Sequence, residues 1–297
     1  MKCDLCPRKC LVDRKKGEKG ICGQTENLKV ARAALHFWEE PCISGDAGSG
    51  AVFFSGCPLH CAFCQNENIA NGTVGKEISL ERLVDIFLEL QEKRANNINL
   101  VTPGHFVPQI VKALDQARRE GLTLPVVYNT SSYETVDTIK MLEGYVDIYL
   151  PDFKYMSPVL SKKYSHAPDY AEVAKAAIAE MVRQTGKAVF VNGDEDNLIL
   201  SGTIVRHLTL PGCMADSMQI LKYLHDTYGD MIYISIMNQF TPLSNLEKYP
   251  ELNRRITDEE YETLVDYAID IGIENGFIQE GDTAEESFIP AFDCEGV

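Results

Sequence analysis

The sequence predicts an α/β fold made of parallel β-α-β units. From Ala51 onward, strand signals alternate with amphipathic helix signals, which is typical of a parallel sheet whose strands are joined by helices. Several strand signals also run into proline, as in Val101-Thr102-Pro103 and Leu150-Pro151, and proline cannot continue a central ladder. About six such units suit an open or partial (β/α) barrel. A doubly wound sheet is the competing architecture, because periodicity alone does not separate the two.

The spacing of apolar residues predicts each element in turn. Residues 51–55 are a continuous apolar run that predicts a buried strand, and Ser79 caps a helix whose apolar residues share one face. A capping box at 257–260 opens the last helix, which carries Leu264, Ala268 and Ile269 on its apolar side. The elements expected between these two helices are strand 98–101, helix 108–120, strand 125–129, helix 134–142, strand 146–150, helix 170–185, strands at 188–191 and 203–210 around an acidic turn at 193–196, helix 216–228 and strand 231–236.

Composition excludes several classes of protein. The 297 residues are 45% hydrophobic and 24% charged, which is ordinary for a globular protein. The chain has 28 Lys and Arg against 44 Asp and Glu, and its formal charge of -16 would repel a phosphate backbone, so no nucleic acid partner is expected. The sequence shows neither a signal peptide nor the roughly 18 apolar residues of a membrane span. We therefore expect a cytoplasmic protein with no membrane partner.

Eight of the ten cysteines lie in the first 64 residues. In a reducing compartment, clustered cysteines more often bind metal or act in catalysis than form disulfides. Residues 1–45 are also short of periodic apolar residues and rich in Cys, Gly, Lys and Arg, so we expect a small cysteine-rich metal-binding segment there, without helix or sheet, and a barrel at 46–297. Cys42, Cys213 and Cys294 are isolated and are expected to be small buried residues.

Cys57, Cys61 and Cys64 follow the first strand of the parallel series. They supply one thiolate fewer than a closed four-ligand metal site needs, so a cluster held by them would keep a position open for a substrate or cosubstrate. Because the carboxyl ends of parallel strands form one rim, the triplet is expected on the rim that carries the chemistry. A zinc site that borrows His60 is the alternative, although His60 is more simply an exposed spacer.

The spacing of this triplet, with Phe63 before the last cysteine, resembles the signature of the radical S-adenosylmethionine (SAM) superfamily. Phe53-Phe54-Ser55-Gly56-Cys57, Asp152-x-Lys154 and Arg206-x4-Pro211-Gly212 are similar to motifs of the glycyl-radical-enzyme activases, the family of pyruvate formate-lyase activating enzyme, and especially to homologues with an added N-terminal cysteine motif. The resemblance implies a partial (β/α)6 barrel and a [4Fe-4S] cluster whose open iron binds S-adenosyl-L-methionine.

The same resemblance implies roles for individual residues. Phe63 would lie beside the adenine. Thr102 and Gly104 stand where the family has Gly-Gly-Glu, so without that glutamate their hydroxyl and carbonyl groups would accept the hydrogen bonds of the SAM amino group. Asn129 and Thr130 are expected to contact SAM, with an exposed or salt-bridged rim position as the alternative. The remaining implied residues are Asp152 and Lys154 near the SAM carboxylate and ribose, Lys154 and Arg206 as catalytic residues, and Asn238 or Gln239 from the last strand.

A second group of cysteines, at positions 3, 6, 10 and 22, supplies enough thiolates for a closed metal site. Its spacing is irregular for a ferredoxin, so zinc and an auxiliary [4Fe-4S] cluster are both open as occupants of Cys3, Cys6, Cys10 and Cys22. A structural site that holds the N-terminal segment on the barrel is preferred to an electron relay. Farther along the chain, His36 and Trp38 are expected to be core and packing residues rather than ligands.

The predicted function is that of a radical SAM oxidoreductase. It would cleave SAM reductively at the cluster to a 5'-deoxyadenosyl radical, which would abstract hydrogen from a protein or peptide substrate. The electron donor would be a low-potential flavodoxin or ferredoxin, and on this acidic chain its docking patch would need local Lys and Arg. The alternatives are radical modification of a small metabolite, and a non-catalytic iron-sulfur or zinc module for electron transfer or scaffolding.

Overall fold

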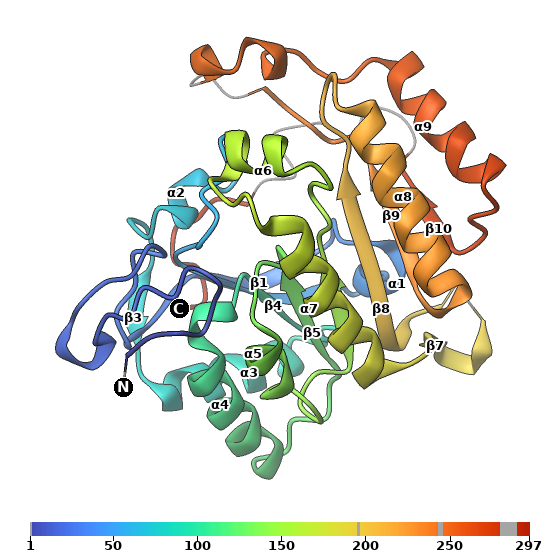
Figure 1. The fold of residues 1–297 in the computed structure, drawn as a ribbon. Helices are drawn as coiled ribbons and strands as arrows, with labels where there is room; N and C mark the ends of the chain where they lie inside the picture. Colours follow the sequence, from blue (N-terminus) through green and yellow to red (C-terminus); the bar gives the residue numbers. More distant parts are fainter. Residues whose placement is uncertain (1, 195–196, 243–245, 280–289) are drawn as a thin grey trace.

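The computed structural model describes residues 2–194, 197–242, 246–279 and 290–297. Within these residues the strands are β1 (Leu28–His36), β2 (Ser49–Phe54), β3 (Lys76–Ile78), β4 (Ile98–Val101), β5 (Val126–Thr130), β6 (Ile148–Pro151), β7 (Val189–Phe190), β8 (Ile199–Leu208), β9 (Tyr233–Met237) and β10 (Gly276–Ile278). They form a sheet in the order β3-β1-β2-β4-β5-β6-β8-β9-β10, with β7 paired to β8 (Figure 1).

The order of the parallel strands decides between the two predicted architectures. From β2 to β10 the main strands pair in parallel, and each lies beside its predecessor in the chain apart from the short β7. A doubly wound sheet would reverse direction at a switch point, and this sheet does not. The antiparallel strands β1 and β3 extend it at the β2 edge. The predicted partial β/α barrel is therefore confirmed.

Helices connect the strands and pack on one another in chain order. They are α1 (Pro41–Ser44), α2 (Glu67–Ala70), α3 (Leu80–Glu92), α4 (Val107–Arg119), α5 (Val136–Lys140), α6 (Pro158–Ser165), α7 (Tyr170–Thr185), α8 (Met214–Tyr228) and α9 (Asp258–Asp270), with 3-10 turns η1 (Arg14–Lys16), η2 (Gly104–Phe106), η3 (Val191–Gly193), η4 (Gly229–Met231), η5 (Leu246–Lys248) and η6 (Pro250–Leu252). None of these combines the length and apolar composition that a bilayer span requires.

Two predicted helix starts are found in the structure. The Ser79 hydroxyl accepts the N–H of Arg82 at 3.1 Å, and Thr257 and Glu260 form the predicted reciprocal capping box of α9. The prediction that Ile269 lies on the buried face of this helix is wrong, because its side chain is 65% exposed. It lies five residues after the buried Leu264, which turns it about 140° away at 3.6 residues per turn.

Side chains alternate along each strand between the face that packs against the helices and the face that lines the inside of the barrel. In β5, Val126 and Tyr128 belong to the cluster that packs against the helices, whereas Val127 belongs to a cluster inside the barrel. Ile43 of α1 joins the inner cluster, and the backbone of α1 is tied to the sheet because Asn97, just before β4, donates to the Ile43 carbonyl at 2.8 Å. The short helix α1 thus fills the barrel at the amino ends of β2 and β4.

Several predictions for the N-terminal region and the isolated cysteines need correction. Residues 28–36 form strand β1 and residues 41–44 form helix α1, so the expected absence of helix and sheet from 1–45 is wrong, while the domain boundary at 45 stays a prediction. Of the three isolated cysteines, Cys42 is buried as predicted, but Cys213 and Cys294 are only half-buried. The predicted acidic turn at 193–196 is described only for its first two residues, and the other two lie outside the described part of the chain.

Candidate functional site

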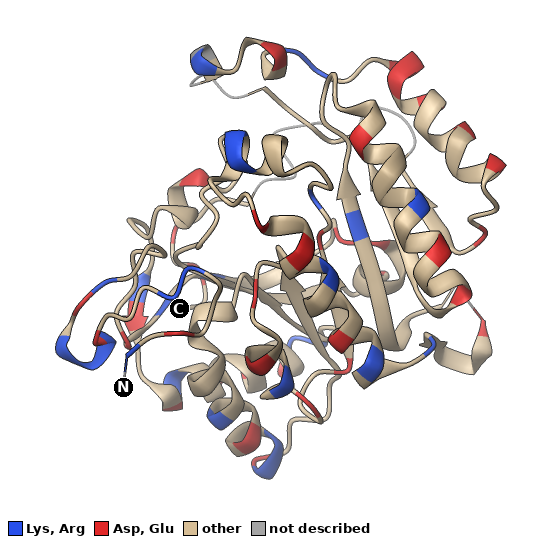
Figure 2. Ribbon diagram, in the orientation of Figure 1, with Lys and Arg blue, Asp and Glu red and all other residues tan. Residues whose placement is uncertain are grey.

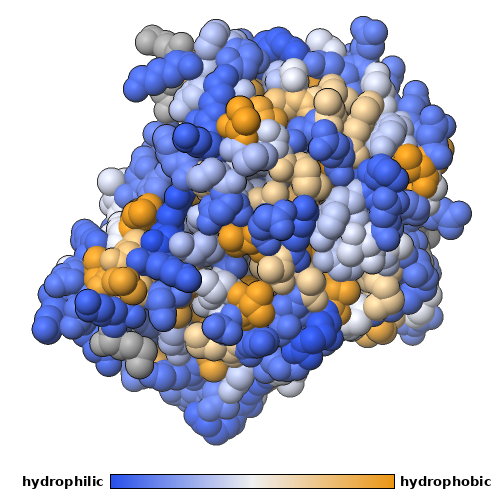
Figure 3. All heavy atoms as spheres, in the orientation of Figure 1, coloured by the Kyte–Doolittle hydropathy of each residue, from blue (hydrophilic) through white to orange (hydrophobic). Residues whose placement is uncertain are grey.

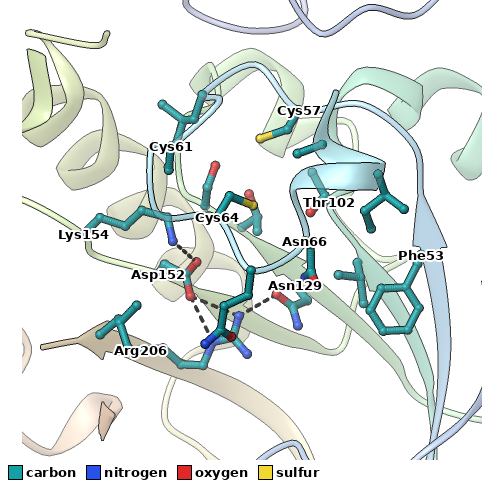
Figure 4. Close-up of a pocket in the computed structure, with 18 of the residues that line it drawn as sticks. Phe53, Cys57, Cys61, Cys64, Asn66, Thr102, Asn129, Asp152, Lys154 and Arg206 are labelled. Carbon is teal, nitrogen blue, oxygen red and sulfur yellow. Dashed lines mark hydrogen bonds and ion pairs between the residues drawn. The ribbon is translucent and has the colours of Figure 1, made fainter. Parts of the chain in front are cut away.

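A cavity of about 260 Å³ lies at the carboxyl ends of the parallel strands (Figure 4). Residues at the ends of β2, β4, β5, β6, β8 and β9, or in the loops after them, line this cavity, as the strand-end pattern predicted. The predicted site residues among them are Cys57, Cys61, Phe63, Cys64, Thr102, Asn129, Thr130, Asp152, Lys154, Arg206 and Gln239.

The loop after β2 brings three thiols to one side of the cavity (Figure 4). Backbone N–H groups donate to the thiols of Cys57 and Cys64, and the Ser165 hydroxyl donates to the Cys61 sulfur at 3.0 Å. Phe63, between the last two cysteines, is 5% exposed and packs on an aromatic cluster that includes Tyr155. Packing of Phe63 therefore anchors the loop while the thiols face the cavity.

These donors fit the iron-sulfur cluster that the sequence predicts. In the protein without metal, burial and then repulsion from neighbouring thiolates raise the pKa of Cys57 to about 11 and also raise that of Cys64. Bound iron would reverse this, because metal coordination deprotonates a thiol. No three His, Cys, Asp or Glu side chains of the described residues surround a single ion-sized point. A [4Fe-4S] cluster does not require that, since each cysteine binds a different iron.

A buried network of ion pairs lines the opposite wall (Figure 4). The Arg206 guanidinium donates to Glu39 at 2.9 Å, to Asp152 at 3.0 Å and to the amide oxygen of Asn129 at 2.7 Å. Lys154 Nζ donates to the second Asp152 oxygen at 2.6 Å. The four charged side chains are each at most 17% exposed, so the loss of one partner would leave a buried charge without compensation.

Strand alternation explains why these side chains meet. Leu150 of β6 and Ile204 of β8 point into the barrel, so Asp152 and Arg206, two residues later on each strand, point the same way. An isolated parallel bridge pairs Asp152 with Arg206, which places them at the same height in the barrel. Asn129 lies two residues after the inward-facing Val127 and completes the layer.

The charge states follow from the same contacts. Burial alone raises the pKa of Asp152, but the Lys154 and Arg206 cations outweigh burial and lower it. Burial lowers the pKa of Lys154, and Asp152 together with the Cys61 thiol outweighs burial and raises it. Both side chains are therefore ionised at neutral pH, and Lys154 lies between a carboxylate and the cysteine loop.

Glu39 is a residue of this site that the sequence analysis did not identify. Its carboxylate accepts hydrogen bonds from the amides of Asn99 and Asn129 at 3.0 and 3.1 Å, in addition to the ion pair with Arg206. Nearby, Trp38 lines the cavity and is 61% exposed, so the prediction that it packs in the core is wrong. The signal in the sequence for Glu39 is a pair of carboxylates, at 39 and 40, three and four residues after the end of β1.

Two predicted SAM-binding residues do not line this cavity. Gly104 lines a second cavity of about 30 Å³, where a Cβ on it would lie 2.9 Å from the Glu134 carboxyl carbon. The chain turns away from the first cavity at Thr102, which has a positive φ of 55° that is rare for a β-branched residue. At the last strand, Gln239 lines the first cavity and Asn238 does not.

The second cavity is bounded by the four N-terminal cysteines. Burial, together with proximity to Cys22, Cys10 and Cys3, raises the pKa of Cys6 to about 12, so the four thiols are neighbours. Backbone N–H groups donate to three of them, including the N–H of Ile21 to Cys10 Sγ at 3.3 Å. Four adjacent thiols with such donors fit a thiolate metal site, for which the chemistry of zinc and of an iron-sulfur cluster are both suitable.

The N-terminal segment packs directly on the cysteine loop. His60, which was expected to be an exposed spacer, is half-exposed, and its Nε2 lies 2.8 Å from the Ile21 carbonyl oxygen. Arg8 Nε donates to the Pro58 carbonyl at 2.9 Å, and Gly56 is so close to the Cys22 carbonyl that a Cβ would lie 2.5 Å from its oxygen. The walls of the two cavities also share three residues, Thr102, Thr130 and Ser131.

Comparison with known proteins agrees with the cysteine loop and the barrel. Residues 51–197 match the family described as the Radical SAM superfamily. An uncharacterized protein of Methanocaldococcus jannaschii is 27% identical over 275 residues, which cover 90% of this chain and 74% of that protein.

SuiB and methylornithine synthase are among the solved structures with a similar fold. SuiB of Streptococcus suis bound to S-adenosylmethionine has a TM-score of 0.51 and 13% identity, over 75% of this chain and 48% of that chain. Methylornithine synthase (PylB) also has a TM-score of 0.51, with 14% identity over 75% of this chain and 60% of that chain. The chain thus spans about half the length of SuiB, and at these identities the likeness shows the fold alone.

Proposed function

Because residues 51–197 match the Radical SAM superfamily, we propose that this protein reduces and cleaves S-adenosylmethionine to abstract hydrogen from a protein or peptide. The observation that carries the proposal is the placement of three thiols and a buried charged network on facing walls of one cavity. A non-catalytic electron carrier would need neither a three-cysteine cluster nor a ligand-sized cavity beside it.

Cys57, Cys61 and Cys64 would hold a [4Fe-4S] cluster and leave its fourth iron to the cosubstrate. When bound and reduced, the cluster supplies one electron to the sulfonium of SAM, which yields methionine and a 5'-deoxyadenosyl radical. The protein binds, orients and shields the reactants. Phe63 holds the cysteine loop by its packing on Tyr155.

In this proposal Lys154 and Asp152 would bind the two ends of the amino acid group of SAM. The Lys154 ammonium lies on the cysteine side of the network, where it would pair with the carboxylate of SAM. The sequence lacks the glutamate of the Gly-Gly-Glu motif, which would accept hydrogen bonds from the SAM amino group. Asp152 and Glu39, two carboxylates on the same wall, would accept hydrogen bonds from that amino group or from the ribose instead. Arg206 joins them and fixes their positions through its three hydrogen bonds.

The size of the cavity favours a large substrate that approaches from the rim. At about 260 Å³ it is slightly smaller than the roughly 300–1,000 Å³ typical of small-molecule pockets, so SAM would leave little room for a second metabolite. A protein or peptide could instead insert only the residue that donates hydrogen. This argument supports an activase-like reaction over the modification of a small metabolite.

The decisive experiment is anaerobic reconstitution with iron and sulfide, reduction with dithionite and measurement of 5'-deoxyadenosine formed from SAM. Wild type should form it, and Cys57→Ala should lose both the product and a large part of the bound iron. Cys213→Ala, which removes a half-buried thiol far from both cysteine groups in sequence, is the matched control and should retain both. Absence of product from reduced, iron-loaded wild type would refute the proposal. Deuterium transfer from a labelled peptide into 5'-deoxyadenosine would then identify the substrate class.

We also propose that Cys3, Cys6, Cys10 and Cys22 hold a second metal site. Iron, sulfide and zinc would be measured on anaerobically purified Cys57→Ala protein, in which the first site is disrupted. Residual iron with matching sulfide would identify an auxiliary [4Fe-4S] cluster, and one equivalent of zinc would identify a structural ion. Retention of neither metal, with wild-type stability in Cys6→Ala, would refute a second site.

A further inference from the structure

The charge of the N-terminal segment is opposite to that of the rest of the chain. Residues 2–20 contain seven Lys and Arg against three Asp and Glu, although the whole protein carries -16. The turn η1, at the left of Figure 2, is drawn in blue because it consists of Arg14, Lys15 and Lys16. The segment is thus a local basic region on an acidic protein, where an acidic partner would be attracted and held.

The basic side chains of this segment are available to a partner. Lys2, Lys9, Lys15, Lys16 and Lys19 are all exposed. The ion pairs of Lys15 with Glu26 and of Lys16 with Asp13 are long, at 4.0 and 3.7 Å, and the lysine side chains in them remain 67% and 77% exposed. Exposed pairs of this kind contribute little and are readily exchanged for another carboxylate.

Apolar side chains lie among these lysines. Leu11 and Ile21 are 52% and 50% exposed, although both are large aliphatic residues. In Figure 3 the left part of the surface, where the N-terminal segment lies, shows hydrophobic atoms bordered by hydrophilic ones. A small apolar centre with a charged rim is the usual composition of a protein-protein contact. We name the surface formed by Lys9, Leu11, Lys15, Lys16, Lys19 and Ile21 the basic face.

The basic face is also next to the candidate cluster site. Ile21, at its edge, contacts His60 through its carbonyl, and His60 lies between two of the cluster cysteines in the loop. Arg8 and Cys22 contact the same loop at Pro58 and Gly56. Electron transfer between proteins needs a short path from donor to acceptor, and a protein docked here would contact the segment that directly covers the loop.

We propose that the basic face is the docking site of an acidic one-electron carrier protein of the flavodoxin or ferredoxin class. The inference rests on the proposed function, because it assigns the carrier to the step that starts SAM cleavage. One electron would leave the reduced carrier, which is oxidised, and enter the cluster at Cys57, Cys61 and Cys64, which is reduced, without transfer of atoms. The second metal site would keep the basic face rigid against the loop.

The test compares three forms of the reconstituted full chain with a purified acidic flavodoxin as the probe. The first form is wild type, and the second carries Lys15→Glu, Lys16→Glu and Lys19→Glu in the basic face. The third is a matched control with the same charge change at exposed lysines of other elements, Lys93→Glu, Lys187→Glu and Lys222→Glu. Calorimetry measures flavodoxin binding at low and high ionic strength, and stopped-flow absorbance follows cluster reduction by flavodoxin hydroquinone and by dithionite.

We expect the basic-face variant to bind flavodoxin on the order of tenfold more weakly at low ionic strength, and to be reduced by flavodoxin correspondingly more slowly. Dithionite, which needs no docking site, should reduce all three forms equally, and the matched control should behave as wild type. Equal binding and reduction in the basic-face variant and wild type would overturn the inference, as would an equal loss in the matched control. Tighter binding of a single-stranded RNA than of flavodoxin would also overturn it, by assigning the face to nucleic acid.

Failure of the proposed function would give a different result. Wild type reduced by dithionite would then form no 5'-deoxyadenosine, while the calorimetric comparison of the three forms would still show whether flavodoxin binds the basic face.

Discussion

Replacing Gly56 by alanine tests whether the N-terminal segment is fixed against the cysteine loop. Gly56 has a φ of +94°, and an added Cβ would lie 2.5 Å from the Cys22 carbonyl oxygen and 2.6 Å from Gln24 Cγ. The backbone of Cys22 cannot move without moving the thiol, and Gln24 is only 3% exposed. We therefore expect Gly56→Ala to push the N-terminal segment away from the loop.

The size of this effect follows from two contributions. A positive φ costs an alanine about 1–2 kcal/mol, and overpacking against a buried backbone costs about 1–3 kcal/mol more. Gly121 and Gly144 are matched controls, because their φ values of +107° and +79° bracket that of Gly56 and a Cβ on either meets nothing within 4 Å. Their alanine variants should show the first contribution only.

Urea unfolding followed by circular dichroism measures these free energies, and hydrogen exchange locates the change. Gly56→Ala should be less stable than both controls by about 1–3 kcal/mol. Faster exchange should appear at residues 2–22 in Gly56→Ala and in neither control. If Gly56→Ala is as stable as Gly121→Ala and exchanges like it, the packing of the N-terminal segment on the loop is refuted.

Three further predictions concern the buried charges, the histidines and the last helix. Arg206→Met should lower the free energy of unfolding by about 3–5 kcal/mol, because it leaves Glu39 unpaired in the barrel, and adding Glu39→Gln should restore part of the loss in urea titrations. Burial lowers the pKa values of His36, His105 and His207 to about 4, 3 and 4, so these three side chains bind more protons in the unfolded chain than in the folded one below about pH 6.5. Their contribution to stability should be complete above that pH and fall as the pH drops toward 4. The fall in stability should be less steep in His105→Gln, and an equally steep fall in that variant would contradict this. Thr257→Ala removes the N-cap of α9 and should cost about 1 kcal/mol in the same titration, whereas Thr263→Ala on the exposed face of α9 should cost less.

The parts of the fold that the sequence predicted well have strong local signals. Helix α3 begins at a serine cap and buries residues spaced by three and four, and α9 begins at a capping box. The sequence does not predict strand β1 because its alternation is irregular: its pairing with β2 shifts register between Val30 and Arg32, and five of its nine residues are alanine or leucine rather than β-branched or aromatic.

In the candidate site, too, residues with a local sequence signal are predicted and residues brought together by the fold are not. Cysteine spacing is local, so the sequence alone predicts the triplet. The pairing of Glu39 with Arg206 joins residues 167 positions apart, and only the closure of the barrel brings them together. Gly104 was assigned by its place in the sequence, but the positive φ at Thr102 directs the chain behind the cavity, and a backbone turn of that kind has no clear signature in a threonine-proline pair.

The helix α1 has a consequence for turnover. Cys42 and Ile43 fill the amino end of the barrel. Among the described residues, ligands therefore enter and leave at the carboxyl ends of the strands. Methionine and 5'-deoxyadenosine would then have to leave past whatever macromolecule had inserted its hydrogen donor. In that arrangement, dissociation of the substrate protein would control how soon the next SAM molecule binds, and a tightly held target would be modified only once per encounter.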